Sequence, residues 1–372
     1  MTPALGVAAS VLPVTTARPF MSPLRTTLAL ALGATLAAGV TAASPASATR
    51  PGSGTTTGTG SVFMVNPVQS SGDQSLTDQG DSAAAVPLDQ YATVQLRNLD
   101  GSGRLVGAWA NVRGNTGPAA YSTTNTFSYL RDDDRFEQVM AYFWVNQAQE
   151  YLQSLGFGHT LRPVNMESQD VRIDQYGVDN SFSWDKHDYL RFGKGGVDDA
   201  EDAEVIVHEY GHAVHDSQVA GFGASEEAGS IGEAFGDYLA VSVGLAAANQ
   251  YGWHVEAEAA CPMDWDSTSY TAAPHCIRRF DRNLTVADKR GEVHFDGQIW
   301  SQALWEIRQG YPGLGLTTAD WDRTLVDSQF DYAPDTSFSA AAQATYAKAL
   351  ADDGDDAAAL VRAEFAERGI TF

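Results

Sequence analysis

Strict alternation of apolar and polar residues predicts β-strands in the first half of the chain. Tyr91–Leu99 and Arg104–Val112 both alternate, and the segment 100–103 between them (DGSG) is typical of a hairpin turn. Ser61–Val68 is suited to a first strand, and Val171–Gly193 to further strands.

Apolar residues recur every three or four positions in other segments, which predicts helices. One such pattern starts after the acidic run 132–134 and continues to Leu155. Later patterns occupy 238–248, 300–307, 339–351 and 355–368. Because strands crowd the first half and helices the second, the sequence predicts an α+β fold.

An HExxH motif runs from His208 to His212, and Glu233 follows 21 residues later. Residues four apart share a helical face, so both imidazoles can reach one metal ion. Glu209 lies roughly 100° round the helix, beside whatever the metal holds. Two imidazoles and a carboxylate leave a tetrahedral Zn²⁺ with one open position, which is typical of a catalytic site. We therefore expect one catalytic zinc on His208, His212 and Glu233.

Local signals place the two helices that carry these residues. Asp198 or Asp199 is expected to cap the HExxH helix, and Ser225 to cap the helix of Glu233. Three glycines in or near the second helix would allow close approach of the two helices at the metal, namely Gly229, Gly232 and Gly236.

Asp237 shares a helical face with Glu233, so one carboxylate can bind metal while the other holds a ligand imidazole. Two other interpretations of the motif are weaker. A metzincin site would need glycine and a third histidine where this chain has His215 and Gln218. A helix whose histidines only cap or hydrogen-bond is disfavoured by the paired carboxylates.

Residues 1–48 contain no acidic residue and are typical of an export signal. Arg25 supplies the positive flank, 27–42 the apolar core, and Ala46-Ser47-Ala48 a small-residue cleavage site. A transmembrane anchor is disfavoured because the apolar run is short and interrupted. We expect a signal peptide at 1–48, a flexible lead-in at 49–60 and a secreted protein.

The formal net charge is −24, and it becomes −26 once 1–48 and its two arginines are removed. A surface this acidic excludes nucleic-acid binding by phosphate neutralisation and favours a soluble protein that stays monomeric. We find no later apolar run long enough to span a bilayer, so we expect no membrane partner. The two cysteines, Cys261 and Cys276, are expected to form a disulfide in an exported protein.

Three segments together resemble the gluzincin zinc metallopeptidases of the thermolysin/fungalysin type: HEYGHAVHD, GEAFGD and EVHFDGQIW. SVFMVNPV also resembles the start of fungalysin catalytic domains. The resemblance implies a two-lobed fold, with a β-rich N-terminal lobe at 61–220, a helical C-terminal lobe at 221–372 and the HExxH helix between them. It also implies an endopeptidase that prefers apolar residues after the scissile bond.

The resemblance assigns roles residue by residue. His208, His212 and Glu233 match the zinc ligands, and Glu209 the general base that acts on a zinc-activated water. The remaining matches are a supporting carboxylate (Asp237), an oxyanion-stabilising histidine just before a helix (His294), a substrate-contacting arginine (Arg278) and an edge strand that pairs with substrate (Asn180 and Ser181).

This chain departs from the family pattern at several positions. The tyrosine that assists the oxyanion should lie near Gly223, where the sequence is Phe222-Gly223-Ala224. Ca²⁺ binding is open, since Glu204 matches one liganding position but the later acidic one falls near Gly244. The carboxylate expected shortly before His294 has two candidates, Asp288 and Glu292. A long prosegment is not expected.

These observations predict a secreted zinc endopeptidase that acts on protein or peptide substrates. Two alternatives stay open: a narrow-specificity or cell-wall peptidase, and a zinc-binding module without catalysis. Glu209 and His294 serve chemistry rather than metal retention, so they argue against the second alternative.

Overall fold

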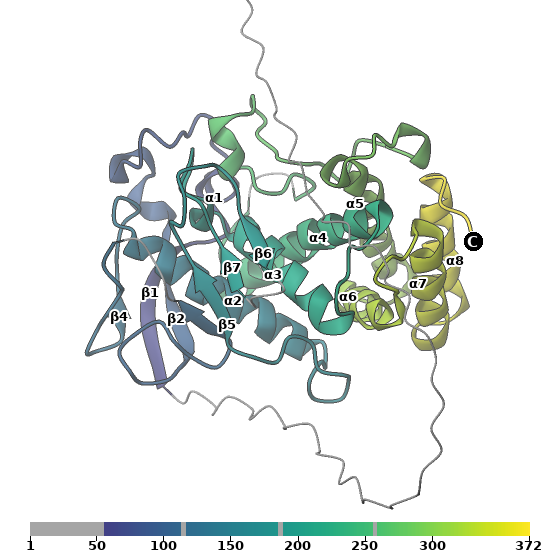
Figure 1. Ribbon diagram of the computed structural model, residues 1–372, viewed down its shortest axis with the longest axis horizontal. Helices are drawn as coiled ribbons and strands as arrows, with labels where there is room; N and C mark the ends of the chain where they lie inside the picture. The colour runs from purple at the N-terminus through teal and green to yellow at the C-terminus, as the bar shows by residue number, and fades with distance from the viewer. Residues whose placement is uncertain (1–55, 113–116, 185–188, 256–258) are drawn as a thin grey trace, which may run out of the picture. The chain divides into compact units, whose positions relative to one another are not determined.

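The computed structural model describes residues 56–112, 117–184, 189–255 and 259–372. These residues belong to one compact unit, Thr49–Phe372. The expected signal peptide at 1–48 and the first part of the lead-in lie outside the described residues. Strands come from the first half of this unit and most helices from the second (Figure 1). The predicted α+β class is confirmed.

Two small sheets contain the described strands. The first has the order β2-β1-β4, with β1 antiparallel to β2 and parallel to β4. The second has the order β3-β5-β7-β6, in which only β6 and β7 are antiparallel. The strands are β1 (Thr56–Phe63), β2 (Tyr91–Leu99), β3 (Ala110–Val112), β4 (Thr126–Phe127), β5 (Gln169–Arg172), β6 (Phe182–Trp184) and β7 (Tyr189–Arg191).

The helices and the short 3₁₀ turns complete the unit. The α-helices are α1 (Pro67–Ser71), α2 (Arg135–Ser154), α3 (Ala203–Gln218), α4 (Glu226–Tyr251), α5 (Val293–Gly310), α6 (Thr318–Ser328), α7 (Phe338–Asp352) and α8 (Asp355–Glu367). The 3₁₀ turns are η1 (Ala83–Ala85), η2 (Leu88–Gln90), η4 (Asp199–Glu201), η5 (Asp266–Ser269), η6 (Val286–Asp288), η7 (Tyr311–Leu314) and η8 (Gln329–Asp331).

The expected hairpin of Tyr91–Leu99 with Arg104–Val112 is wrong. β2 has the predicted bounds, but its partner is β1, which lies alongside it in an antiparallel register. The later segment makes isolated bridges only, and its end becomes β3 in the other sheet, parallel to β5. β1 pairs with β2 along nearly its whole length, whereas the return segment meets β2 only where Leu99 also bridges to Gly107.

The expected flexible lead-in and first strand also need correction. Thr56–Gly60 belongs to β1, whereas Ser61–Val68 is strand only as far as Phe63. Asn66 then caps α1 by accepting a hydrogen bond from the backbone of Gln69. β1 is the central strand of its sheet, so pairing on both sides orders a Gly/Thr-rich segment that composition alone marks as flexible.

The HExxH helix begins later than predicted. Its N-cap is Asp202, whose side chain accepts a hydrogen bond from the Glu204 backbone at 2.9 Å, while Asp199 lies in η4. Asp202 also accepts from the Asn66 side chain and from the backbone of Asp266, so tertiary contacts select it among neighbouring acids. Ser225 caps α4 as predicted.

The buried residues form one hydrophobic cluster that extends from β1 to α8. α2, close to its predicted bounds, covers β1: the rings of Phe63 and Phe136 lie 4.7 Å apart, and Trp144 Nε1 donates to the Phe63 carbonyl. The sheet-bearing and helical parts therefore share one core.

α4 is long and apolar enough, by length and composition, to cross a membrane, contrary to our expectation that no later run would be. However, 83% of its apolar window is buried inside the protein, as in the core helix of a globular domain. Its apolar character therefore reflects packing around the site that it carries.

Candidate active site

α3 and α4 bring the three predicted metal ligands together. His208 Nε2 lies 3.1 Å from His212 Nε2, and Glu233 carboxylate oxygens lie 3.4 and 3.6 Å from these two nitrogens. Ligand atoms 2.0–2.1 Å from a tetrahedral metal are about 3.3–3.4 Å apart. Glu233 Oε2 is buried and accepts no hydrogen bond. The donor set and its spacing therefore fit Zn²⁺.

Glycine lets the two helices approach closely at this point. A Cβ on Gly236 would lie 2.6 Å from His208 Nδ1, and one on Gly211 would lie 3.0 Å from the Gly236 Cα. On Gly232 a Cβ would be in ordinary contact, 3.7 Å from His212 Nδ1. On Gly229 it would lie 2.9 Å from Val293 of α5. The predicted role in α3–α4 approach thus holds for Gly236 and not for Gly232.

Asp237 and Arg278 orient the His208 ring through its Nδ1 atom. Asp237 Oδ1 lies 2.9 Å from His208 Nδ1, and the Arg278 guanidinium donates two hydrogen bonds to the same carboxylate. Burial raises the pKa of Asp237, but the charges and hydrogen bonds of Arg278 and His208 together outweigh burial, and the net pKa is lowered. The carboxylate therefore stays ionised and orients the ring so that Nε2 faces the metal position.

Glu209 stands beside the ligand cluster with one oxygen free of hydrogen bonds. Its side chain is buried and Oε2 has no partner. Burial raises the pKa of Glu209 to about 7; the nearby His208 charge opposes this shift and Glu233 adds to it. A carboxylate whose pKa lies near neutral can take up and release a proton during a reaction.

His294 faces the cluster from α5. Its Nε2 lies 3.5 Å from Glu233 Oε2, and its Nδ1 lies 2.6 Å from Glu292 Oε1. The structure thus brings Glu292 to the ring, whereas Asp288 closes the capping box of η6. His294 lies in the first turn of α5 and not before it, because Glu292 caps the helix one residue upstream of its start.

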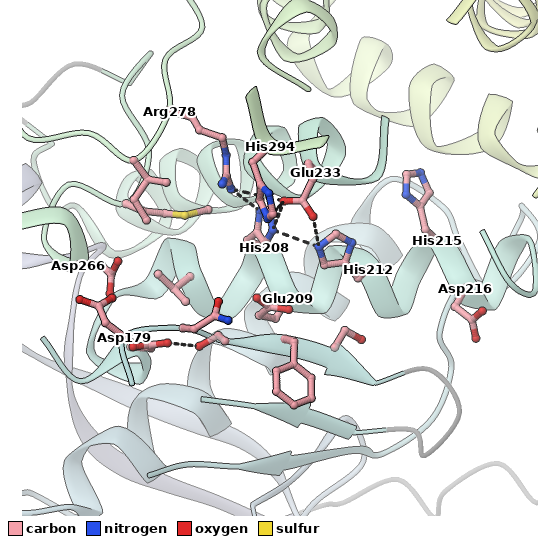
Figure 2. Close-up of a pocket in the computed structure, with 18 of the residues that line it drawn as sticks. Asp179, His208, Glu209, His212, His215, Asp216, Glu233, Asp266, Arg278 and His294 are labelled. Atoms are coloured by element: carbon pink, nitrogen blue, oxygen red, sulfur yellow. Dashed lines mark hydrogen bonds and ion pairs between the residues drawn. The ribbon is translucent and has the colours of Figure 1, made fainter. Parts of the chain in front are cut away.

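These residues line an open cleft of about 540 Å³. Figure 2 shows His208, Glu209, Glu233 and His294 around its middle. Asn180 and Ser181 also line the cleft, directly before β6, which is the edge strand of its sheet. Arg278 lines it too, although its guanidinium hydrogen bonds go to Asp237.

The chain segment that brings Arg278 to the cleft is closed by a disulfide. Cys261 and Cys276 are bonded, as predicted, with a Cα–Cα distance of 5.3 Å. Met263, Asp266 and Tyr270, within this loop, line the cleft. The bond therefore ties one wall of the cleft together.

Sequence reasoning missed residues at both ends of the cleft. His215 is buried between the rings of Phe222 and Phe235, with centroids 4.3 and 4.4 Å away, and neither ring nitrogen has a partner. At the other end lie three aspartates, from the segment before β6, from η4 and from η5: Asp179, Asp199 and Asp266. His215 lies three residues beyond the HExxH motif, on the same helix, and no local pattern links the aspartates.

Glu204, which matches one position of the family's calcium cluster, engages the protein itself. Its Oε2 accepts hydrogen bonds from Gln69 Nε2 at 2.7 Å and from the Met263 backbone at 2.6 Å. Burial raises the pKa of this carboxyl group well above its usual value. Glu204 Oε2 is thus held by two donors from the protein itself.

Two histidines and a glutamate converging beside an unpartnered carboxylate define the metal site of a zinc hydrolase. Residues 174–312, which include this site, match the model of the fungalysin metallopeptidase (M36) family. This match agrees with the resemblance seen in the sequence: residues 174–312 are similar to zinc metallopeptidases of the thermolysin/fungalysin type, and the enzymatic class that the match supports is metalloendopeptidase.

Among solved structures, the precursor of protealysin, a metalloproteinase from Serratia proteamaculans, is similar to this chain. The sequence identity is 18%, the match covers 63% of this chain and 79% of that chain, and the TM-score is 0.49. No curated protein sequence matches the chain.

Proposed function

We propose that the protein is a secreted endopeptidase in which His208, His212 and Glu233 hold one zinc ion and Glu209 is the general base. The observation that carries the proposal is the spacing of the two imidazole nitrogens and the Glu233 carboxylate oxygens, 3.1–3.6 Å, beside a buried Glu209 oxygen without a partner. Zn²⁺ bound there would lower the pKa of a water from 15.7 toward about 7 and polarise the substrate carbonyl.

Glu209 would accept a proton from the attacking water and later deliver it to the leaving amine. Its pKa of about 7 suits both transfers, because neither protonation state is strongly favoured near neutral pH. Its unpartnered Oε2 leaves it available for a water in the cleft.

Other residues would position the substrate and stabilise charge. His294 would donate a hydrogen bond to the oxygen that becomes negative, and Glu292 would hold its ring. Asp237 and Arg278 would keep His208 in place. The backbone at Asn180 and Ser181 would pair with an extended peptide, since β6 is an edge strand.

Secretion is proposed from the sequence of residues 1–48 and is consistent with the disulfide between Cys261 and Cys276. The net charge of −24 supports peptides, rather than nucleic acids, as partners and a monomer in solution.

The test is Glu209→Gln, which preserves volume and removes the base. We expect zinc content to equal that of the wild type and hydrolysis of casein or a quenched peptide to fall at least 100-fold. Glu367→Gln, an exposed change on α8, is the matched control. Equal hydrolysis by wild type and Glu209→Gln would overturn the proposed role of Glu209.

A further inference from the structure

Three aspartates lie together at one end of the catalytic cleft: Asp179, Asp199 and Asp266. Each offers a carboxylate oxygen within 4.8 Å of the others, and all three line the cleft that contains His208 and Glu209. Figure 2 shows Asp179 and Asp266 at the end opposite to His215 and Asp216.

These carboxylates lack a positive partner. Asp199 and Asp266 are 2% and 4% exposed, and the Oδ1 atom of each is buried without a hydrogen bond. The other oxygen of Asp199 accepts a hydrogen bond from the neutral hydroxyl of Ser181, and that of Asp266 from the neutral hydroxyl of Tyr270. In the described part of the chain, no lysine or arginine forms an ion pair with any of the three aspartates.

The arginine that lines the same cleft already has a carboxylate partner. Arg278 lines the same cleft, but its guanidinium donates both of its short hydrogen bonds to Asp237. Burial raises the pKa values of Asp179, Asp199 and Asp266, and their mutual repulsion adds to the shift of Asp199 and Asp266. A cation that enters between carboxyl groups buried in this way stabilises their ionised form.

The surrounding chain fixes the position of the trio. Gly196 has φ 78°, and a Cβ there would lie 2.3 Å from Asp179 Oδ2. Ser269 Oγ donates to the same oxygen at 2.9 Å. Tyr270 holds Asp266 with a hydrogen bond of 2.8 Å. The three side chains come from separate segments, yet packing and hydrogen bonds set their spacing before a ligand arrives.

We propose that this end of the cleft is a specificity pocket for a cationic side chain, lysine or arginine, beside the scissile bond of the substrate. The inference rests on the proposed endopeptidase function and names the substrate class. An ammonium group has three donors and no acceptor, which suits the three acceptor oxygens. The apolar preference that the family resemblance implies would not hold at this position.

A substrate side chain fits the site better than a resident divalent cation. The trio opens on the cleft, next to Asn180 at the edge where an extended peptide would pair. Asp179 is exposed, so a side chain that enters from the cleft meets it first. A divalent cation is the competing occupant, and the experiment has to separate the two.

The experiment compares quenched peptides that differ only by lysine or norleucine, placed in turn on each side of the scissile bond. Norleucine has the length of lysine without its charge. For the wild type we expect kcat/KM to be about 10- to 100-fold higher with lysine at one position, the range of a charge-assisted hydrogen bond. Asp266→Asn and Asp179→Asn should each reduce this ratio about tenfold or more.

Asp216→Asn is the matched control, because it removes the same charge at the other end of the same cleft and should keep the lysine-to-norleucine ratio. Hydrolysis of the norleucine peptide reports whether each variant is folded. If Asp266→Asn does not fold, the lysine-to-norleucine ratio of Asp179→Asn tests the inference, because Asp179 is exposed and its substitution disturbs the core less.

Equal hydrolysis of the lysine and norleucine peptides by the wild type would overturn the inference of a cationic specificity pocket. It would leave the proposed endopeptidase function standing. Failure to cleave either peptide would overturn the proposed function, and this inference with it. Ca²⁺ titration of the zinc-loaded protein adds a third outcome: binding that Asp266→Asn abolishes, without a lysine preference, would assign the trio to a metal ion and overturn the inference.

Discussion

Arg278 donates hydrogen bonds to both oxygens of Asp237, from Nε at 2.6 Å and from Nη2 at 2.5 Å. Asp237 Oδ1 in turn lies 2.9 Å from Nδ1 of His208. His208 on α3, a proposed zinc ligand, is therefore oriented by an ion pair between α4 and the segment that follows the disulfide loop. Zinc affinity should depend on this pair although neither residue binds the metal.

We expect Asp237→Asn to weaken zinc binding about 10- to 100-fold, because a neutral amide holds the His208 ring less firmly and leaves the buried Arg278 charge without its partner. A competition titration with a zinc chelator measures the dissociation constant. Asp281→Asn, which breaks the partly exposed pair with Arg279, is the control and should leave zinc binding unchanged. An unchanged dissociation constant for Asp237→Asn would contradict the assigned role.

Comparing Gly236→Ala with Gly232→Ala separates two effects of a glycine-to-alanine change on α4. One is a clash with the proposed zinc ligand His208, and the other is the higher helix propensity of alanine. The added Cβ of Gly236→Ala would lie 2.6 Å from His208 Nδ1, so we expect lower zinc affinity and a lower melting temperature. The added Cβ of Gly232→Ala meets its neighbours at 3.7 Å and should be neutral, or stabilising by up to about 1 kcal/mol. Thermal unfolding with metal analysis tests both, and equal effects would refute the explanation.

His294→Ala should lower kcat about 10²- to 10³-fold with little change in zinc content, the usual effect of losing one oxyanion donor. Glu292→Gln should lower kcat less, because glutamine retains an oxygen that can cap α5 but holds the His294 ring without a charge. Steady-state kinetics with one peptide measures both. His159→Ala, at an exposed position, is the control. Unchanged kcat for His294→Ala would remove His294 from the mechanism.

The preference for lysine over norleucine should increase with pH through about 7. Burial raises the pKa of Asp199 to about 7, and a cation binds the ionised carboxylate more strongly. The titratable groups that interact with Asp199 include Tyr176, Asp179, Glu209 and Asp266. The ratio of kcat/KM for the two peptides cancels the titration of Glu209 in catalysis. A ratio that does not change between pH 5.5 and 8.5 would contradict this expectation.

The sequence predicted the features that depend on local spacing. α2, the HExxH helix and the helix of Glu233 follow from the 3.6-residue period, and the placement of Glu233 and Asp237 on one face follows from the same geometry. Ser225 was recognisable as a cap because its hydroxyl can reach the first turn of its own helix. None of these features needs information about distant parts of the chain.

Features that depend on competition between distant segments could not be predicted in this way. The alternation in β2 is compatible with a hairpin, yet its strand partner is β1, and the end of the return segment pairs with β5 in the other sheet. Asp198, Asp199 and Asp202 are equivalent caps by composition, and only contacts from Asn66 and Asp266 distinguish Asp202. A strand partner or a cap is chosen by total free energy, to which residues far away in the sequence contribute.

The sequence by itself determined that His208 and His212 share one face of a helix with Glu209 beside it, because a helix converts spacing along the chain into direction in space. Only the tertiary structure decided that Arg278 would orient His208 through Asp237, that Glu292 would hold His294, and that three aspartates from separate segments would meet at one end of the cleft. Such contacts arise between elements whose relative placement depends on the packing of the whole core, and no local period encodes that placement.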